Sequence, residues 1–226
     1  MNKNCILGGI LAGGLSRRMD VEDKSLVLLN NQTLISQVAS RLSKQVGSMV
    51  INSNSDPHNY VGLEYPVIGD VIQGYAGPLA GIHALMCFAK RHDSNITHVA
   101  TVAADTPFFP FDFVDHCTKS LDDQSHRNST IVLAKSGQNR HPVFGLWPVN
   151  LCDNLELFLN NAETRKVMAF VQQHALQYAE FQIYELDGTV IDPFFNINRP
   201  DDLVQAATIF EKLLAIEHHS QGCQNR

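Results

Sequence analysis

Short apolar runs alternate with amphipathic runs along most of this chain, and this alternation is what most constrains its fold. Residues 5–11 (CILGGIL) and 98–103 (HVATVA) have the composition of buried strands. Between them, residues 33–44 and 79–91 place their apolar side chains at helical spacing. Strands that alternate with helices in this way are typical of α/β folds built on a mostly parallel sheet.

The rest of the chain continues the same pattern. Further strands are expected at 49–51, 65–68, 130–133 and 143–147, helical structure at about 150–175, and a short apolar segment at 194–197. Pro200 opens a final helix with two acidic residues in its first turn, where negative charge suits the helix dipole. No change in composition marks a linker, so we expect a single domain over residues 1–218 and a polar tail over 219–226.

The composition excludes several classes of protein. Hydrophobic residues make up 44% and charged residues 18% of the 226 positions, which excludes global disorder. The net charge of −6 lacks the basic footprint of a nucleic-acid binder, although a local site can still bind an anion. No apolar stretch approaches a membrane span of about 18 residues, and the N-terminus resembles neither a secretory signal nor a transit peptide. We therefore expect a cytoplasmic protein.

The cysteines and histidines form no recognisable metal or disulfide motif. Five cysteines stand at wide spacings without a C-x-x-C pair, which favours free buried thiols over a disulfide framework or a zinc site. Cys87, on the expected helix after Gly81, is interpreted as a core residue rather than a nucleophile. The ten histidines show no metal-ligand spacing, and His141, which precedes Pro142, is expected to lie near the site in a structural role.

The first predicted strand leads directly into a glycine-rich turn, LAGGLSRRM at residues 11–19. Gly13 and Gly14 would let the backbone approach a ligand and direct its amides at phosphate oxygens, and Arg18 adds a guanidinium group. The spacing matches neither a Walker P-loop nor the G-x-G-x-x-G dinucleotide fingerprint. An ordinary strand–turn–helix junction would explain two glycines by themselves, but the serine and arginines that follow weaken that alternative.

Two charged residues are candidates for the chemistry. Asp105 ends the most apolar predicted strand, where a carboxylate needs a partner or a cation such as Mg²⁺; a helix cap or turn before Thr106-Pro107 is the alternative. Lys24 would offset the charge of a triphosphate, or it is a surface lysine beside Asp23. Because ligands bind at the carboxyl ends of parallel strands, Asp105, the glycine turn, Asn52 and Asp70 would converge on one crevice.

Two further segments have glycines or amides at useful positions. The run GYAGPLAG at 74–81 would let a second part of the ligand lie against a helix start, or it only shapes the entry into that helix. In FNINRP at 195–200, Asn196 and Asn198 can project to the same side of an extended segment. The alternatives are that Asn198 caps the final helix and that Asn196 satisfies a turn.

These motifs, in this order, make the chain similar to a known family. LAGGLSRRM with Lys24 resembles the L-A-G-G-x-S-x-R-M…K signature of nucleotidyltransferases of the glycosyltransferase-A-like class. With GPLAG at 77–81, ADTP at 104–107 and NINRP at 196–200, the chain resembles the bacterial molybdenum cofactor guanylyltransferases over about residues 6–203. The resemblance implies a Rossmann-like three-layer α/β sandwich, as in nucleotide-diphospho-sugar transferases, with helices on both faces of a mostly parallel sheet.

The resemblance also implies an activity: transfer of GMP from Mg-GTP to molybdopterin-bound molybdenum, with release of pyrophosphate, to give molybdopterin guanine dinucleotide. Mg²⁺ is then the cofactor and GTP and the molybdopterin cofactor are the substrates. Molybdopterin-inserting proteins and acceptor molybdoenzymes are the implied protein partners. We expect a monomer, with a weak oligomer as the alternative.

Carried over by position, the family's site residues fall into two groups. Those implied for GTP are Leu11, Ala12, Gly13, Gly14, Lys24, Asn52, Asp70 and Asp105, of which Asp105 would bind Mg²⁺ and, with Lys24 and Arg18, act in catalysis. Those implied for molybdopterin are Gly77, Gly81, Asn196 and Asn198, with Arg165 or Lys166 as a further contact.

The chain departs from the family at Asp20 and Val21, where members often have glycines. This substitution makes the loop stiffer and more negative near phosphate. Two alternatives remain: a sugar-1-phosphate or cytidylyl-type nucleotidyltransferase, and a non-catalytic nucleotide-binding or cofactor-delivery module. The missing dinucleotide fingerprint disfavours a nicotinamide oxidoreductase, and the absence of a G-x-S-x-G motif gives no support to a serine hydrolase.

Overall fold

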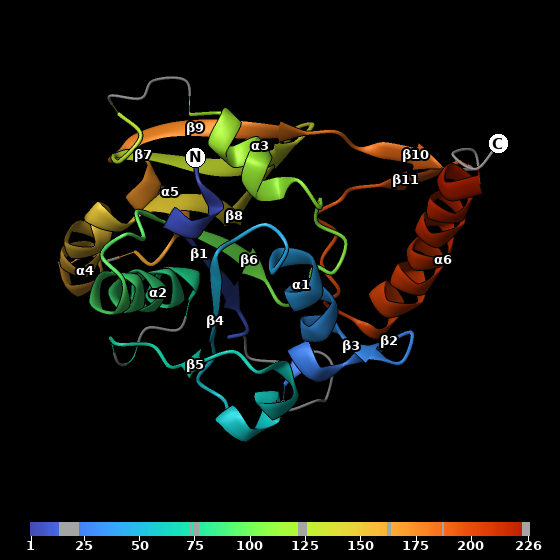
Figure 1. Cartoon of the computed structure of the whole chain (residues 1–226), viewed down its shortest axis with the longest axis horizontal. Coiled ribbons are helices and arrows are strands. Elements are labelled where there is room, and N and C mark those ends of the chain that lie inside the picture. Colours follow the sequence, from blue (N-terminus) through green and yellow to red (C-terminus); the bar gives the residue numbers. More distant parts are fainter. Residues whose placement is uncertain are drawn as a thin grey trace.

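A central sheet organises the computed structural model, which describes residues 1–13, 23–72, 74, 77–121, 126–161, 164–186 and 188–222 (Figure 1). Within those residues the sheet has seven strands in the order β5-β4-β1-β6-β8-β7-β9, and β8 runs antiparallel to both of its neighbours. The other pairs are parallel. The strands are β1 Ile6–Leu11, β4 Ser48–Asn52, β5 Val67–Ile68, β6 His98–Ala103, β7 Thr130–Ser136, β8 Asn139–Pro148 and β9 Ala175–Phe181.

Helices cover both faces of this sheet and bury an apolar core on each. Successive side chains of a strand point to opposite faces, so Ile6 and Ile10 of β1 join one core while Leu7 and Leu11 join the other. The first core includes α1 (Leu34–Leu42) and α3 (Phe113–Lys119); the second includes α2 (Pro78–His92), α4 (Cys152–Asn161) and α5 (Val167–Val171). The predicted three-layer α/β architecture is confirmed.

Glycine at position 9 allows α2 to pack close to the central strand. A Cβ atom built on Gly9 would lie 2.3 Å from Cδ1 of Leu85, a distance that real contacts do not reach. The side chain of Leu85 therefore occupies the space left by the missing Cβ. This close packing fixes α2 against β1, and so it fixes the start of α2 relative to the carboxyl end of that strand.

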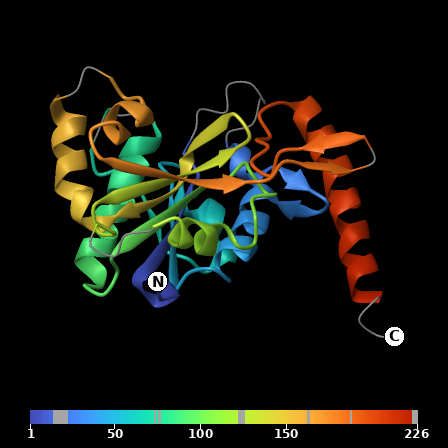
Figure 2. The same ribbon diagram turned by 90° about the horizontal axis from the view of Figure 1, so that it is seen from above.

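A third, smaller core lies at one end of the molecule. It joins α6 (Pro200–Gly222) to two short antiparallel hairpins, β2–β3 (Leu28–Leu29 and Gln32–Thr33) and β10–β11 (Tyr184–Leu186 and Thr189–Ile191). Figures 1 and 2 place α6 and the β10–β11 hairpin at the end of the sheet opposite to α4. Four 3-10 turns complete the described elements: η1 Lys3–Cys5, η2 Lys24–Leu26, η3 Pro57–Leu63 and η4 Val149–Leu151.

Most of the predicted elements are present, and the helical structure expected at about 150–175 is divided into several elements. It contains η4, α4 and α5, and the edge strand β9 begins at Ala175. Among the described strands, β9 pairs only with β7, and it is partly exposed. Its sequence therefore lacks the continuous apolar run of a buried strand, and the strand was not predicted. The short α3 and the two hairpins were also missed. Helix α6 continues to Gly222, into the segment 219–226 that was expected to be a polar tail.

None of the described helices is long and apolar enough to span a lipid bilayer.

Candidate active site

The carboxyl ends of three neighbouring strands meet at one edge of the sheet. Leu11, the last residue of β1, is in register with Asn52 of β4 and Ala103 of β6. The amide of Ala12 donates to the Asn52 carbonyl (2.9 Å), and the amide of Ala104 donates to the Leu11 carbonyl (3.1 Å). The start of the glycine turn and the residues leading to Asp105 therefore lie side by side, as the strand pattern predicted.

Part of that turn lies outside the described residues. Leu11, Ala12 and Gly13 are described, and a Cβ on Gly13 would meet none of the described atoms within 4 Å. Gly14 and Arg18 belong to the undescribed segment 14–22, as do Asp20 and Val21. The roles that we predicted for these four residues stay predictions.

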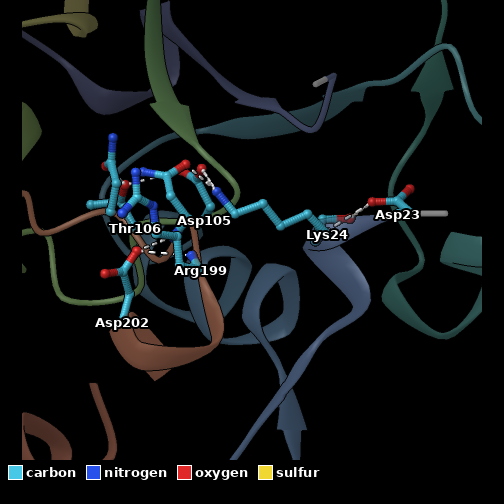
Figure 3. Close-up of polar contacts among 9 residues, drawn as sticks. Asp23, Lys24, Asp105, Thr106, Arg199 and Asp202 are labelled. Atoms are coloured by element: carbon cyan, nitrogen blue, oxygen red, sulfur yellow. Dashed lines mark hydrogen bonds and ion pairs between the residues drawn. The ribbon is translucent and has the colours of Figure 1, made fainter. Parts of the chain in front are cut away.

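A lysine bridges two oxygens from distant parts of the chain (Figure 3). Nζ of Lys24 lies 2.6 Å from Oδ2 of Asp105 and 2.6 Å from Oδ1 of Asn198. The side chains of Lys24 and Asp105 are only 16% and 24% exposed, so water screens this ion pair less than it would a surface pair. Lys24 is thus not a solvated surface lysine. The side-chain oxygens of Asp105 and Asn198 both point at its ammonium group.

The turn that carries Lys24 is held from both sides. Asp23 caps η2, because its Oδ1 accepts hydrogen bonds from the Ser25 amide (3.0 Å) and the Ser25 hydroxyl (2.6 Å). Its other oxygen accepts from the hydroxyl of Tyr60, a buried residue of η3. Burial, followed by the hydrogen bond to Asp23, raises the pKa of Tyr60 and so keeps its hydroxyl protonated. Tyr60 is a positioning residue that the sequence analysis missed, since a lone tyrosine carries no motif.

The turn after β6 is tied to the segment before α6. The buried hydroxyl of Thr106 donates to Oδ1 of Asn196, and the Ile197 amide donates to the Asp105 carbonyl at 3.0 Å. Asn196 thus joins the two segments, rather than satisfying a turn of its own. These bonds hold the second asparagine, Asn198, close enough for its side chain to reach Lys24.

Asp202, not Asn198, satisfies the amides at the start of α6. Its Oδ2 accepts from the amides of Asn198 (2.7 Å) and Arg199 (2.9 Å), and Figure 3 shows this carboxylate beside Arg199. Such a carboxylate near a helix N-terminus also interacts favourably with the helix dipole. Because Asp202 caps these amides, the Asn198 side chain is available to accept a hydrogen bond from Lys24. The alternative that Asn198 only caps the final helix is therefore wrong.

Asn52 and Asp70 form a second polar group at the same edge. Nδ2 of Asn52 donates to Oδ1 of Asp70 (3.1 Å) and to the Ile68 carbonyl (3.3 Å). Asn54 donates to the other Asp70 oxygen at 2.9 Å. A Cβ on Gly81 would lie 2.2 Å from Oδ1 of Asn52, so only glycine lets the first turn of α2 approach this group.

The other predicted residues are placed as follows. Gly77 precedes α2, where a Cβ would meet no atom within 4 Å. Arg165 and Lys166 are exposed in the segment between α4 and α5, and their expected contact with a second substrate stays a prediction.

His141 belongs to a buried network behind the site. Its Nε2 lies 2.6 Å from the hydroxyl of Ser136, which donates to both oxygens of Asp192 (3.0 and 2.9 Å). Burial lowers the pKa of His141, against the opposing charge of Asp192. Asp192 in turn accepts from the Phe194 amide at 3.0 Å. Ser136 is fully buried and lies between His141 and Asp192, so the three residues are not arranged as a hydrolase triad. The network instead supports the loop that leads to Asn196.

A family model and named relatives match most of this chain. The family model described as "MobA-like NTP transferase domain" matches residues 8–177. A protein of Rhizobium leguminosarum bv. trifolii named "Molybdenum cofactor guanylyltransferase" is 42% identical over 210 residues, which is 93% of this chain and 95% of that protein. A protein of Rhizobium johnstonii with the same name is 40% identical over 215 residues, 95% of this chain and 98% of its own length.

A solved structure has the same fold. Molybdopterin-guanine dinucleotide biosynthesis protein A from Archaeoglobus fulgidus superposes with a TM-score of 0.68, covering 91% of this chain and 99% of its own, at 24% identity.

Proposed function

This chain belongs to the family of MobA-like NTP transferases and is a nucleotidyltransferase, and on that premise we propose that it is a molybdenum cofactor guanylyltransferase. It transfers GMP from Mg-GTP to the phosphate group of the molybdopterin that carries molybdenum, releases pyrophosphate and forms molybdopterin guanine dinucleotide. Two relatives of about 40% identity that match it over nearly their whole lengths carry this name. The observation that carries the proposal is the bridge from Lys24 to Asp105 and Asn198, beside the end of β1.

The chemistry needs charge neutralisation more than a general base. The acceptor is a phosphate monoester, which is largely ionised at neutral pH because its second pKa is about 6. It is already a nucleophile, but it must approach a triphosphate of the same charge. A site with the Lys24 ammonium beside the end of β1 supplies positive potential where the two anions meet, and this stabilises in-line attack on the α-phosphorus.

The residues at the bridge fit a magnesium ion. Asp105 and Asn198 each direct one oxygen at the same cation, the Lys24 ammonium, and Mg²⁺ prefers oxygen ligands, typically one or two carboxylates with substrate phosphates. When bound, Mg²⁺ would neutralise phosphate charge there. Lys24 would then have a second function, because the ammonium that balances Asp105 could turn to the phosphates once a metal ion takes its place.

The two substrates would bind on different sides of the sheet edge formed by the carboxyl ends of the strands. In this proposal the β1 end (Leu11, Ala12, Gly13, Gly14), together with Asn52 and Asp70, binds the guanine nucleotide. The buried amide of Asn52 and the carboxylate of Asp70 are already oriented by their mutual hydrogen bond. Asn196, Asn198, Gly77 and Gly81 face the molybdopterin side, with Arg165 or Lys166 as a further contact.

One assay tests the proposal. Purified protein is incubated with molybdopterin cofactor and Mg²⁺ and with each of the four ribonucleoside triphosphates, and pyrophosphate is measured. We expect release with GTP that requires the molybdopterin acceptor. Release with CTP and a sugar-phosphate acceptor would replace the proposal with a cytidylyl or sugar-1-phosphate transfer. Nucleotide binding without any pyrophosphate would indicate a non-catalytic module.

A further inference from the structure

Three soft donor side chains meet on the far side of α2, outside the proposed active site. His83 and Cys87 stand one turn apart on α2, and Cys152 is the first residue of α4, which lies beside α2 in Figure 1. Sγ of Cys87 lies 3.3 Å from Nε2 of His83 and 3.4 Å from Sγ of Cys152. The three ligand atoms all lie within 4.8 Å of one another.

We propose that His83, Cys87 and Cys152 form a binding site for a thiophilic divalent cation of the zinc type. At usual Zn–S and Zn–N bond lengths and tetrahedral angles, two ligand sulfurs are about 3.8 Å apart and a sulfur and a nitrogen about 3.6 Å apart. The two measured separations are within a few tenths of an ångström of these values. Two of the three donor separations therefore already match a tetrahedral ion, and the third, between His83 and Cys152, lies within 4.8 Å.

The imidazole of His83 is buried and directs Nε2 at the sulfur of Cys87. The ring is 1% exposed, and within the described residues its Nδ1 has no hydrogen-bond partner. His83 uses a single nitrogen, and that nitrogen faces the two sulfurs.

The donor set also distinguishes this cluster from the edge that holds Asp105. Thiolate and imidazole select zinc-like ions, whereas carboxylate and amide oxygens suit Mg²⁺. Two thiolates and a neutral imidazole balance the charge of one divalent ion, and each thiol gives its proton to solvent on binding. Cys152 is buried, but Cys87 is half-buried, which gives the ion a way in from solvent.

Binding there would connect two helices that are already joined by an ion pair. Nζ of Lys90 on α2 contacts Oδ1 of Asp153 on α4 at 2.7 Å. His83 follows Gly81 by two residues, so an ion at the cluster would fix the first turns of α2 that pack against Asn52. The three protein ligands leave a fourth tetrahedral position for water.

Cobalt(II) is the probe for the test, because thiolate coordination gives it a near-ultraviolet charge-transfer absorption that oxygen ligands do not give. The full-length protein carries Cys5→Ser and Cys223→Ser, which leaves the cluster and the core residue Cys117. We expect saturation at one equivalent of Co²⁺, and displacement by one equivalent of Zn²⁺. The variants His83→Gln, Cys87→Ser and Cys152→Ser should each weaken binding at least tenfold.

The controls separate this site from the proposed active site and from oxidation. Asp105→Ala should keep the full charge-transfer absorption, since it removes only an oxygen donor at the other edge. Circular dichroism checks that each variant is folded, and Cys152→Ala provides a second variant if Cys152→Ser unfolds. Absence of the absorption in the reduced parent protein would overturn the proposal. So would a Cys87–Cys152 disulfide, seen as a mass lower by two hydrogen atoms, that persists with reductant and prevents zinc uptake.

Discussion

The ammonium of Lys24 lies 2.6 Å from Oδ2 of Asp105, although the two residues are 81 positions apart in the sequence. The parallel register of β1 and β6 and the cap that Asp23 places on η2 bring them together. The lysine therefore acts as the counter-ion of the carboxylate before any substrate binds. Both residues are expected to be essential, for different reasons.

Replacing Lys24 by methionine should reduce kcat/KM for GTP by about 10²–10³, the usual effect of removing one preorganised group that stabilises a transition state. Methionine keeps the unbranched stem, so the loss reports the charge. Steady-state pyrophosphate release measures it. Lys119→Met serves as the matched control, because Lys119 is exposed on α3 and pairs with Asp115. Unchanged GTP kinetics in Lys24→Met would contradict a role at the phosphates.

Asp105→Asn should lose most transfer activity while the protein stays folded. The amide keeps the size of the side chain, and the backbone carbonyl still accepts the bond from Ile197. The charge that would hold Mg²⁺ and balance Lys24 is removed. Pyrophosphate release across a Mg²⁺ titration, with thermal unfolding alongside, measures both effects. Asp153→Asn, an exposed carboxylate on α4, is the control, and near-normal rates in Asp105→Asn would exclude the metal role.

Tyr60→Phe should impair catalysis at a distance from the reacting atoms. It removes the hydroxyl that holds Asp23, so the turn carrying Lys24 loosens. We expect a stability loss of about 1 kcal/mol, typical of one hydrogen bond, and a KM for GTP that rises more than kcat falls. Asp23→Asn should act through the same contact, so the double variant should be little worse than either single one. Additive losses would show that the two residues act independently.

The sequence predicted the strands that converge on the site because each is a buried apolar run that ends in a polar residue. Asn52 and Asp105 could therefore be placed at one edge from the pattern alone. Tyr60 could not, since its role depends on η3 folding back onto Asp23. The cluster of His83, Cys87 and Cys152 was missed for the same reason: its third member is 65 residues from Cys87 and comes from another helix.

Thr106→Val should affect the second substrate more than GTP. Valine has nearly the shape of threonine but cannot donate to Asn196, so the segment that carries both asparagines loses its orientation. Asn196 is itself exposed, so water can replace the lost bond, and we expect a stability loss of about 0.5–1.5 kcal/mol. We expect KM for the molybdopterin acceptor to rise severalfold with little change in KM for GTP. Serine at this position keeps the hydroxyl and should restore acceptor binding; an equal change in both KM values would argue against the assignment of sides.

His98 should make the fold less stable as the pH falls. The ring is fully buried, and its Nε2 must donate to the Arg127 carbonyl (3.1 Å), which leaves Nδ1 to accept from Thr97 in the neutral form. Burial lowers the pKa of His98 in the folded protein, although the bond to Arg127 opposes this shift. The unfolded chain therefore binds more protons below its own pKa of about 6.5, and stability decreases as the pH falls below that value. Urea unfolding of the wild type and of His98→Gln between pH 8 and about pH 5 checks this, and a fall of the same steepness in both proteins would rule His98 out as its source.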